Sequence, residues 1–211
     1  MTAIAPAKPA NKHELRTRET RSLLLHAAET IFVRDGYEGA ELGEIAALAG
    51  RTKGAIYAQF KSKEDIFLAL IDDRTRRGRT QMEEAFAHST TVQGNIAALR
   101  AFYLGRTEDR AWSLLMLEFK LYCLRHPESK KRLLSHYAEV FPGNEEARFS
   151  EYLGPAPRGR ESVSRSLAIQ VLHPFISALV LEAELNGLPD EDAIRKVTNC
   201  IFDALLELKT P

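Results

Sequence analysis

Residues 42–67 read LGEIAALAGRTKGAIYAQFKSKEDIF, and this stretch decides the fold of the N-terminal part of the chain. Apolar residues recur at helical spacing up to Ala49, and Gly50 interrupts the pattern before a second short helix begins at Thr52. Another helix begins at Ser62, which is spaced from Asp65 as in a capping box. The stretch therefore predicts a helix-turn-helix.

The segments on either side have helical patterns as well. A helix is predicted from Glu14 to Arg34, and Gly36 suits the left-handed residue that ends it. No segment alternates with a period of two. Further helices are predicted near residues 92–104, 110–125, 128–141, 162–186 and 190–208. The sequence therefore predicts an all-α fold, in which an N-terminal three-helix helix-turn-helix domain is joined by a shared helix to a C-terminal helical domain.

Composition and charge set the expected organisation. The chain of 211 residues has no net charge, but residues 1–80 hold 14 basic and 11 acidic side chains, whereas residues 81–211 hold 15 and 18. The N-terminal part is thus mildly basic, which is compatible with nucleic-acid contact by local charges. We expect three segments. They are a disordered arm at residues 1–13, a helix-turn-helix domain at 14–75, and a second domain at 76–211.

The sequence also bears on the compartment. Cys123 and Cys200 are the two cysteines and both lie in apolar helical context, which fits a reducing environment. The N-terminus lacks the apolar region of a secretory signal, and the longest apolar stretch is too short to span a bilayer. We therefore expect a cytoplasmic protein with no membrane association.

The residues that begin the helix at Thr52 suit contact with double-stranded DNA. Thr52 can cap the helix and bind a phosphate, and Lys53 can reach a guanine edge or a phosphate. Gly54 and Ala55 are small enough to let the backbone approach the DNA closely. Contacts to the DNA backbone are expected from Tyr57, Gln59 and Lys63. We assign the apolar residues of this region to the core, namely Ile45, Ile56 and Phe60.

At residues 17–74 the sequence resembles the DNA-binding domain of the TetR/AcrR regulators. The matching residues are Ala27-Ala28, Phe32, Gly36-Tyr37, Ile45-Ala46, Ala49-Gly50, Lys53 to Phe60 and Ser62 to Phe67. Two positions depart from the family pattern: Glu41 replaces the usual Ser or Thr, and Arg51 replaces a small apolar residue. We expect the Glu41 carboxylate to cap its helix but repel phosphate, and Arg51 to offset that loss with a contact to phosphate or base.

The resemblance implies a regulator, by default a repressor, that binds a palindromic DNA operator as a homodimer and is released by an unknown small-molecule effector. The sequence supports the dimer, because residues 162–186 are apolar on nearly all sides and the last helix carries a heptad-like seam. The predicted dimer interface comprises Leu167, Val171, Phe175, Ala178, Leu179, Ile194, Val197, Ile201 and Leu205.

Residues 76–211 are thus expected to form a ligand-binding and dimerisation domain. The middle helices are rich in large side chains, a pattern that sequence alone does not separate from a solid core. Pro174 is expected to kink its helix beside His173. The predicted ligand-binding residues are Phe102, Trp112, Met116, Phe119, Tyr122, Tyr137 and His173.

Other functions have less support. The chain has no phosphate-binding glycine loop, no G-x-S-x-G elbow and no H-E-x-x-H motif, so we expect no enzyme, no catalytic residues and no cofactor. Cys123 and His126 have the spacing of half a metal site, and without a second half we predict no metal. Two alternatives stay open: a DNA-binding protein of this fold without a ligand, in an architectural or cell-cycle role, and a thiol or metal sensor.

Overall fold

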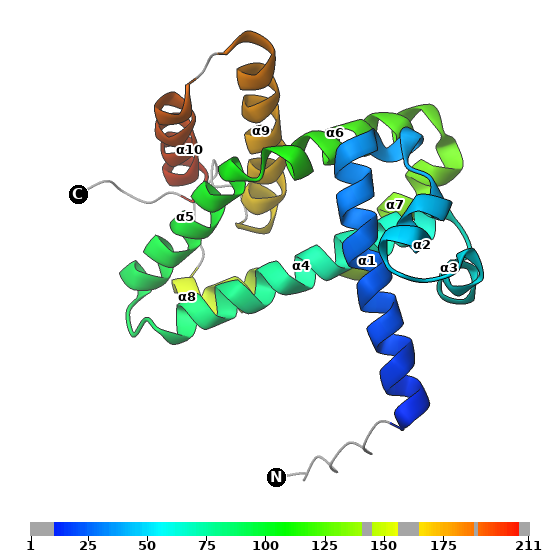
Figure 1. The fold of residues 1–211 in the computed structure, drawn as a ribbon. Coiled ribbons are helices and arrows are strands. Elements are labelled where there is room, and N and C mark those ends of the chain that lie inside the picture. The colour runs from blue at the N-terminus through cyan, green and yellow to red at the C-terminus, as the bar shows by residue number, and fades with distance from the viewer. Residues whose placement is uncertain (1–10, 141–144, 156–164, 188–189, 207–211) are drawn as a thin grey trace. The chain divides into compact units, whose positions relative to one another are not determined.

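The computed structural model describes residues 11–140, 145–155, 165–187 and 190–206. These residues form helices and contain no β-strand, which confirms the all-α prediction (Figure 1). Their bounds are α1 Lys12–Gly39, α2 Leu42–Leu48, α3 Lys53–Gln59, α4 Lys63–Ala87, α5 Val92–Glu108, α6 Arg110–Arg125, α7 Pro127–Val140, α8 Glu145–Leu153, α9 Arg165–Asn186 and α10 Glu191–Leu206.

The chain divides into two compact units, residues 1–71 and 72–211. The division falls between Ile71 and Asp72, inside α4, so one continuous helix belongs to both units. The sequence had suggested a division after residue 75, within the same helix.

The start of α1 differs from the expected arm. Asn11 caps the helix, because its Oδ1 accepts a hydrogen bond from the backbone amide of Glu14 (2.9 Å) and the Glu14 carboxylate accepts one from the Asn11 amide (3.2 Å). This capping box starts the helix at Lys12, so His13 is helical and not part of an arm. The rest of the expected arm, residues 1–10, lies outside the described residues.

The core of the first unit is formed where α1, α2, α3 and the beginning of α4 meet. Three aromatic rings lie at its centre: Phe67 packs edge-on against Phe32, with ring centroids 5.0 Å apart, and against Tyr37 at 5.2 Å. Ile45, Ile56 and Phe60 are buried, as predicted. Gly36 adopts φ 74° and ψ 173°, a conformation that side chains disfavour, and it separates the long part of α1 from its last turn.

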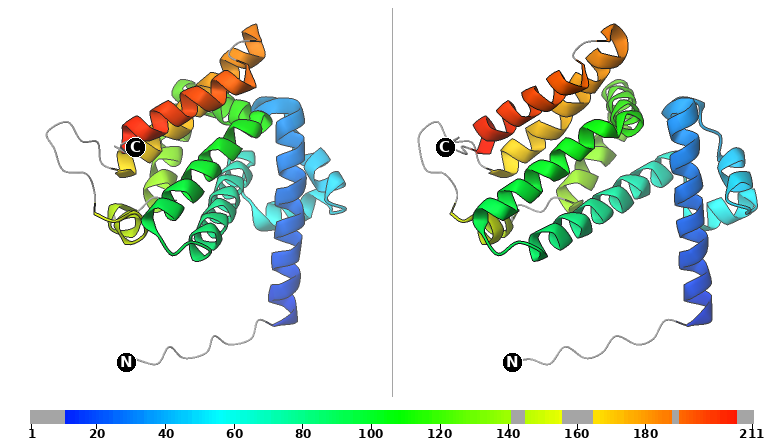
Figure 2. Two further views of the ribbon diagram at one scale, coloured as in Figure 1. Left: turned by 90° about the vertical axis from the view of Figure 1, so that its left-hand side faces the viewer. Right: turned by 60° about the vertical axis from the view of Figure 1, so that its left-hand side comes forward.

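The second unit is built from the rest of α4 and from α5 to α10. Helices α9 and α10 run side by side, and α9 also packs on α6 and α5 (Figures 1 and 2). The fully buried large side chains of this unit are Leu99, Phe119, Leu172, Ile176, Val180 and Phe202. Helix α9 continues through Pro174. Among the described helices, none has both the length and the apolar character needed to cross a bilayer.

Helix α8 was not predicted from the sequence. It has only two buried apolar side chains among the described ones, Phe149 and Leu153, which is too short a pattern to recognise. Contacts with distant residues hold it in place. Asn95 donates a hydrogen bond to the Tyr152 carbonyl (2.8 Å), and the buried Arg165 donates to the carbonyl that follows α8 at Gly154 (2.7 Å).

Candidate DNA-binding site

The turn between α2 and α3 is set by backbone hydrogen bonds. Gly50 has φ 64°, and its amide donates to the Ala47 carbonyl (3.0 Å) while the next amide, of Arg51, donates to the Ala46 carbonyl (2.9 Å). These two bonds form a Schellman motif, which ends α2 and requires a left-handed residue at the glycine. The motif turns the chain directly into α3.

Helix α3 begins as predicted. The Thr52 hydroxyl caps it by accepting a hydrogen bond from the Ala55 amide (3.3 Å). One face of α3 packs inward through Ile56, and the opposite face presents Lys53, Gly54 and a Tyr57 side chain that is 56% exposed. A short helix with polar and small residues on its outer face is what the major groove admits.

Glu41 does not behave as expected. It occupies the N-cap of α2 and is exposed, but its carboxylate makes no capping hydrogen bond. Its longer side chain suits the cap geometry less well than Ser, Thr or Asp. A capping role for Glu41 is therefore wrong, whereas its predicted repulsion of phosphate stays a prediction.

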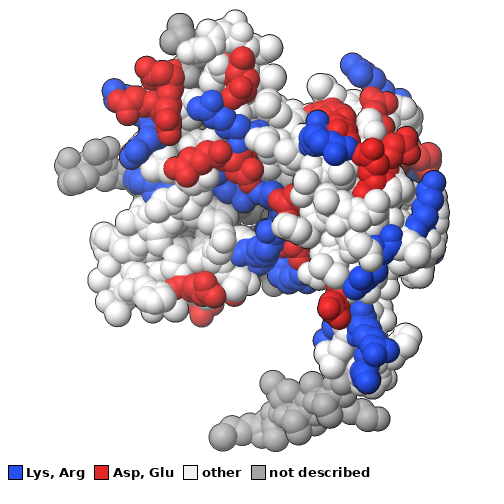
Figure 3. Space-filling model, in the orientation of Figure 1, with Lys and Arg blue, Asp and Glu red and all other residues white. Residues whose placement is uncertain are grey.

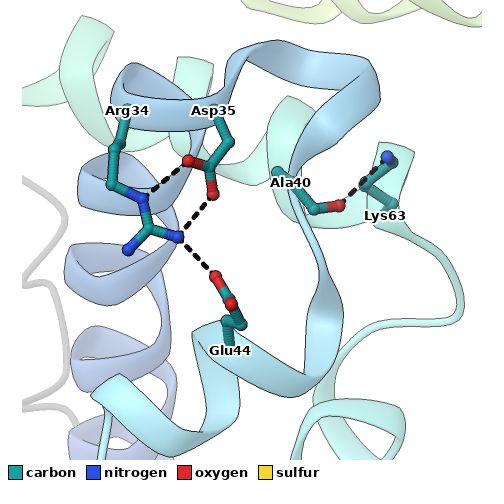
Figure 4. A network of polar contacts seen from close by, with 5 residues as sticks. All are labelled: Arg34, Asp35, Ala40, Glu44 and Lys63. Carbon is teal, nitrogen blue, oxygen red and sulfur yellow. Dashed lines mark hydrogen bonds and ion pairs between the residues drawn. The ribbon is translucent and has the colours of Figure 1, made fainter.

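Side-chain contacts join the two helices on either side of the α1–α2 corner (Figure 4). Arg34 at the end of α1 forms ion pairs with Asp35 (2.6 Å) and with Glu44 of α2, and the hydrogen bond from Arg34 holds the pKa of Asp35 below its usual value. Glu44 is thereby oriented toward α1. The first turn of α2 keeps its place against α1 through a contact that spans ten positions of the chain.

Lys63 has an internal role that the sequence did not indicate. Its Nζ donates hydrogen bonds to the backbone carbonyls of Ala40 (3.1 Å; Figure 4) and Glu38 (2.7 Å). It also lies 5.3 Å from the centre of the Tyr37 ring. These contacts connect the start of α4 to the end of α1. A phosphate contact by Lys63 stays a prediction, since two of its three donors are used within the chain.

The remaining predicted DNA contacts lie at the same end of the first unit. Arg51 donates a hydrogen bond to the Gly50 carbonyl (3.1 Å), and the side chains of Ala55 and Gln59 are half-buried. Basic side chains also gather on the N-terminal half of α1, where Arg16 and Arg18 are exposed (Figure 3).

Arg21, the third arginine of this half of α1, packs over the Phe60 ring at 4.5 Å. The contact ties α1 to the end of α3. Arg21 therefore supports the first unit from within, whether or not it also approaches DNA.

The predicted ligand-binding residues all belong to the second unit, and their role in ligand binding stays a prediction. Trp112, Met116 and Phe119 are buried core residues. Tyr122 stacks on His126, with ring centroids 3.9 Å apart. These four side chains are thus engaged in packing, as a solid core requires.

Three predicted residues have more polar surroundings. Burial raises the pKa of Tyr137 to about 12, and burial together with nearby positive charges lowers the pKa of His173 to about 4. Phe102 lines a cavity of about 350 Å³ whose other walls include Arg77 and Arg106. Sequence reasoning missed these arginines, although Arg77 follows one turn after Arg74 on the same face of α4.

The predicted dimer residues differ in how exposed they are in the single chain. Leu167 and Val171 on α9 are exposed, at 50% and 45%. Ile194 is different, because it is 2% exposed within the single chain and packs inside the second unit. Its assignment to the interface stays a prediction, although the single chain leaves almost none of its surface for a partner. The other members are exposed or half-buried, namely Phe175, Ala178, Leu179, Val197, Ile201 and Leu205.

The two cysteines differ in their surroundings. Cys123 is buried and Cys200 is exposed, and neither thiol is in a disulfide. Within the part of the chain that the structure describes, no three His, Cys, Asp or Glu side chains are placed to hold a metal ion. No observation among the described residues favours the thiol or metal sensor.

Comparison with known proteins agrees with this geometry. The model of the bacterial regulatory proteins of the tetR family matches residues 24–70, which span α1 to α4. The HTH-type transcriptional repressor AcnR of Corynebacterium efficiens is 27% identical over 198 residues, or 90% of this chain and 93% of that protein. The repressor BepR of Brucella suis is 46% identical over 107 residues, or 46% of this chain and 49% of BepR.

A solved structure shows the same fold over the whole length. The regulator FadR of Bacillus subtilis, in complex with stearoyl-CoA, has a TM-score of 0.61 at 20% identity and covers 90% of this chain and 99% of its own. The helix-turn-helix, the family match and the full-length relatives therefore agree. Residues 24–70 of this chain therefore form a helix-turn-helix domain that matches the tetR family of bacterial regulatory proteins.

Proposed function

We propose that this regulator is a cytoplasmic repressor that binds a palindromic operator as a homodimer and leaves it when a small-molecule effector binds. The observation that carries the proposal is the outer face of α3, where Lys53, Gly54 and Tyr57 are exposed and Thr52 caps the helix. These groups can reach base edges and phosphates once α3 enters a major groove. The repressor names of the relatives AcnR and BepR support the same function.

The exposed apolar stripe on α9 supports the dimer. Its side chains follow one another at intervals of three, four or seven residues along the helix, and they are exposed to solvent in the single chain. A stripe of this length on one helix is stabilised when a second copy covers it. Its members are Leu167, Val171, Ala178, Leu181 and Leu185. Two copies of the α9–α10 pair would form a four-helix interface with two-fold symmetry.

Two-fold symmetry has a consequence for the operator. The two α3 helices of a dimer read two half-sites that are inverted copies of each other, about one helical turn or roughly 34 Å apart. Helix α4 provides the route for release, because it belongs to both units. An effector that favours one position of α4 changes the spacing of the α3 helices. Operator DNA then weakens effector binding by the same factor.

The test is selection of bound duplexes from a random DNA pool with the full chain, read by sequencing. We expect an inverted-repeat consensus and a steep fall in affinity with salt, because lysine and arginine contacts release counterions from DNA. A Lys53→Ala variant should lose the consensus, whereas Arg76→Ala, on the exposed surface of α4, should keep it.

The outcomes separate the candidate functions. Absence of both a consensus and salt-dependent binding would contradict the proposal. Salt-dependent binding without a consensus would favour the ligand-free architectural alternative. A consensus with half-sites about one turn apart would support the dimeric repressor.

A further inference from the structure

A cavity of about 350 Å³ lies in the second unit between α4 and α5. Its walls have an unusual composition for a ligand pocket, because three arginines line it together with a single aspartate and one large apolar ring. These residues are Arg74 and Arg77 of α4, Phe102 and Arg106 of α5, and Asp109, which follows α5. In Figure 3, Lys and Arg atoms gather over the middle of α4.

Two of the arginines have acidic partners. Arg74 forms an ion pair with Asp109 and lies over the Trp112 ring at 4.3 Å from its centre. Arg77 pairs through Nε with Asp73, one turn earlier on α4 (2.9 Å), and its side chain is 53% exposed. Arg77 thus lines the cavity with a side chain that is partly exposed to solvent.

Arg106 differs from both. Its guanidinium lies 5.8 Å from the centre of the Phe102 ring, and no acidic residue in the described parts of the chain pairs with it. Burial lowers its pKa, and the charge of Arg77 lowers the pKa further. A guanidinium nevertheless stays protonated, so the fold holds a half-buried cation without an acidic partner among the described residues. Such a charge is unfavourable unless an anion completes the site.

The surrounding helices add positive charge. Lys120 of α6 is largely buried, which lowers its pKa, and no acidic residue of the described chain pairs with it. The pKa of His173 on α9 is lowered first by burial and then by the charges of Arg106, Lys120 and Arg74. Cationic groups from three helices, α4, α5 and α6, therefore lie near His173 of α9, which stays neutral among them at physiological pH.

We propose that this cavity binds a small organic anion whose carboxylate or phosphate is held by Arg106 and Arg77 and whose body lies against Phe102. The size agrees with a small metabolite, since ligand pockets range from about 300 to 1,000 Å³. Gly78, Ala101 and Gly105 leave the walls free of long side chains. Guanidinium groups match the geometry of both carboxylate and phosphate.

This inference rests on the proposed function, because it identifies the chemical class of the effector. The two arginines that would hold the anion lie on different helices, Arg77 on α4 and Arg106 on α5. An anion bound by both draws α4 toward α5 and removes the repulsion between the two guanidinium groups. Because α4 begins in the first unit, the bound anion acts on a helix whose first turns also belong to the unit that holds the helix-turn-helix.

The experiment measures binding to the full-length protein by calorimetry and by the shift in thermal midpoint. The probes are succinate, hexanoate and inorganic phosphate, each at the same ionic strength set with chloride. We expect at least one probe to bind the wild type, and Arg106→Met to raise its dissociation constant by roughly 10- to 100-fold. Arg76→Gln is the matched control, because Arg76 lies on the same helix as Arg77, is 76% exposed and does not line the cavity.

The ligand-free variants provide a second readout. Removing an unpaired buried charge should leave the thermal midpoint of Arg106→Met unchanged or higher, whereas loss of a structural residue would lower it. If this variant does not fold, Arg77→Gln tests the same site. The Arg77 side chain is partly exposed, so its replacement should weaken anion binding with little change in the thermal midpoint of unfolding. Binding of phosphate alone would identify a phosphate ester, and binding of a carboxylate alone a carboxylic acid.

Two results would overturn the inference: no probe binds the wild type, or Arg76→Gln weakens binding as much as Arg106→Met. Operator binding is measured separately on the same samples. A protein that selects an operator but binds none of the anions contradicts this inference and leaves the repressor function standing. A protein that binds an anion through Arg106 but selects no operator contradicts the repressor function and leaves the anion site standing.

Discussion

Lys63 donates a hydrogen bond from Nζ to the backbone carbonyl of Ala40, at 3.1 Å, and so joins the first turn of α4 to the end of α1 (Figure 4). The same ammonium group donates to Glu38. The sequence alone assigned Lys63 to DNA phosphate contact, and the two roles predict different results on substitution.

Lys63→Met should lower the free energy of unfolding by about 1–2 kcal/mol, because two backbone carbonyls lose a charged donor. The measurement is urea unfolding followed by circular dichroism. The salt dependence of operator binding decides the second role. If Lys63 also contacts phosphate, the slope of log K against log salt falls by about 0.9; we expect a smaller change, since the internal contacts occupy the group.

Gly54→Ala should separate DNA binding from stability. A Cβ at this position would meet only the Thr52 hydroxyl, at an ordinary contact distance of 3.7 Å, so the fold itself does not require glycine. Alanine in the helix should raise the free energy of unfolding by up to about 1 kcal/mol. The added methyl group faces outward beside Lys53, and we expect operator affinity to fall at least roughly tenfold in a gel-shift titration.

Gly105→Ala on α5 is the matched control for Gly54→Ala, because a Cβ there meets no atom within 4 Å. Gly105 also lines the anion cavity, so operator affinity is titrated in the absence of any effector. Gly105→Ala should stabilise its helix by a similar amount and leave operator affinity unchanged. Unchanged operator affinity in Gly54→Ala would show that this part of α3 does not contact DNA.

Val171→Glu should convert the dimer to monomers. Val171 is 45% exposed in the single chain, and it lies in the middle of the apolar stripe of α9. Two-fold symmetry would bring two buried carboxylates near each other, so the dissociation constant of the dimer should rise by roughly 100-fold or more. Size-exclusion chromatography with light scattering gives the mass. Leu124→Glu on α6, at 66% exposure, is the control and should leave the mass unchanged.

His173 should make stability depend on pH. Its pKa is about 4 in the folded chain against 6.5 for the free side chain, because burial and the charges of Arg106, Lys120 and Arg74 disfavour protonation. The unfolded chain then binds a proton near pH 6.5 that the folded chain does not, so stability falls as pH decreases from 6.5 toward 4, by on the order of 3 kcal/mol.

His173→Gln removes this contribution, and its free energy of unfolding should change less between pH 7 and pH 4 than that of the wild type. The measurement is urea unfolding at several pH values. His88→Gln is the control, since His88 is exposed on the surface after α4. Equal pH dependence in both variants would show that His173 is not the titrating group.

The sequence by itself determined the helix-turn-helix, because its signals act over short distances along the chain. The amides of Gly50 and Arg51 end α2 by donating to carbonyls three and five residues earlier, respectively. The Thr52 hydroxyl starts α3 by accepting a bond from the amide three residues later. Ile56 and Phe60 are buried because they repeat at helical spacing. Such features are visible in a single sequence, and the family resemblance depends on the same residues.

Only the tertiary structure decided the roles that depend on residues far apart in the chain. The ammonium group of Lys63 bonds to the Glu38 and Ala40 carbonyls because the start of α4 lies against the end of α1. Ile194 is buried within the single chain because α10 packs on other helices of the second unit. Arg77 and Arg106 form one positively charged cavity because α4 and α5 lie together. Each residue alone resembles an ordinary surface charge or apolar helix position, and its function follows from the neighbours that folding provides.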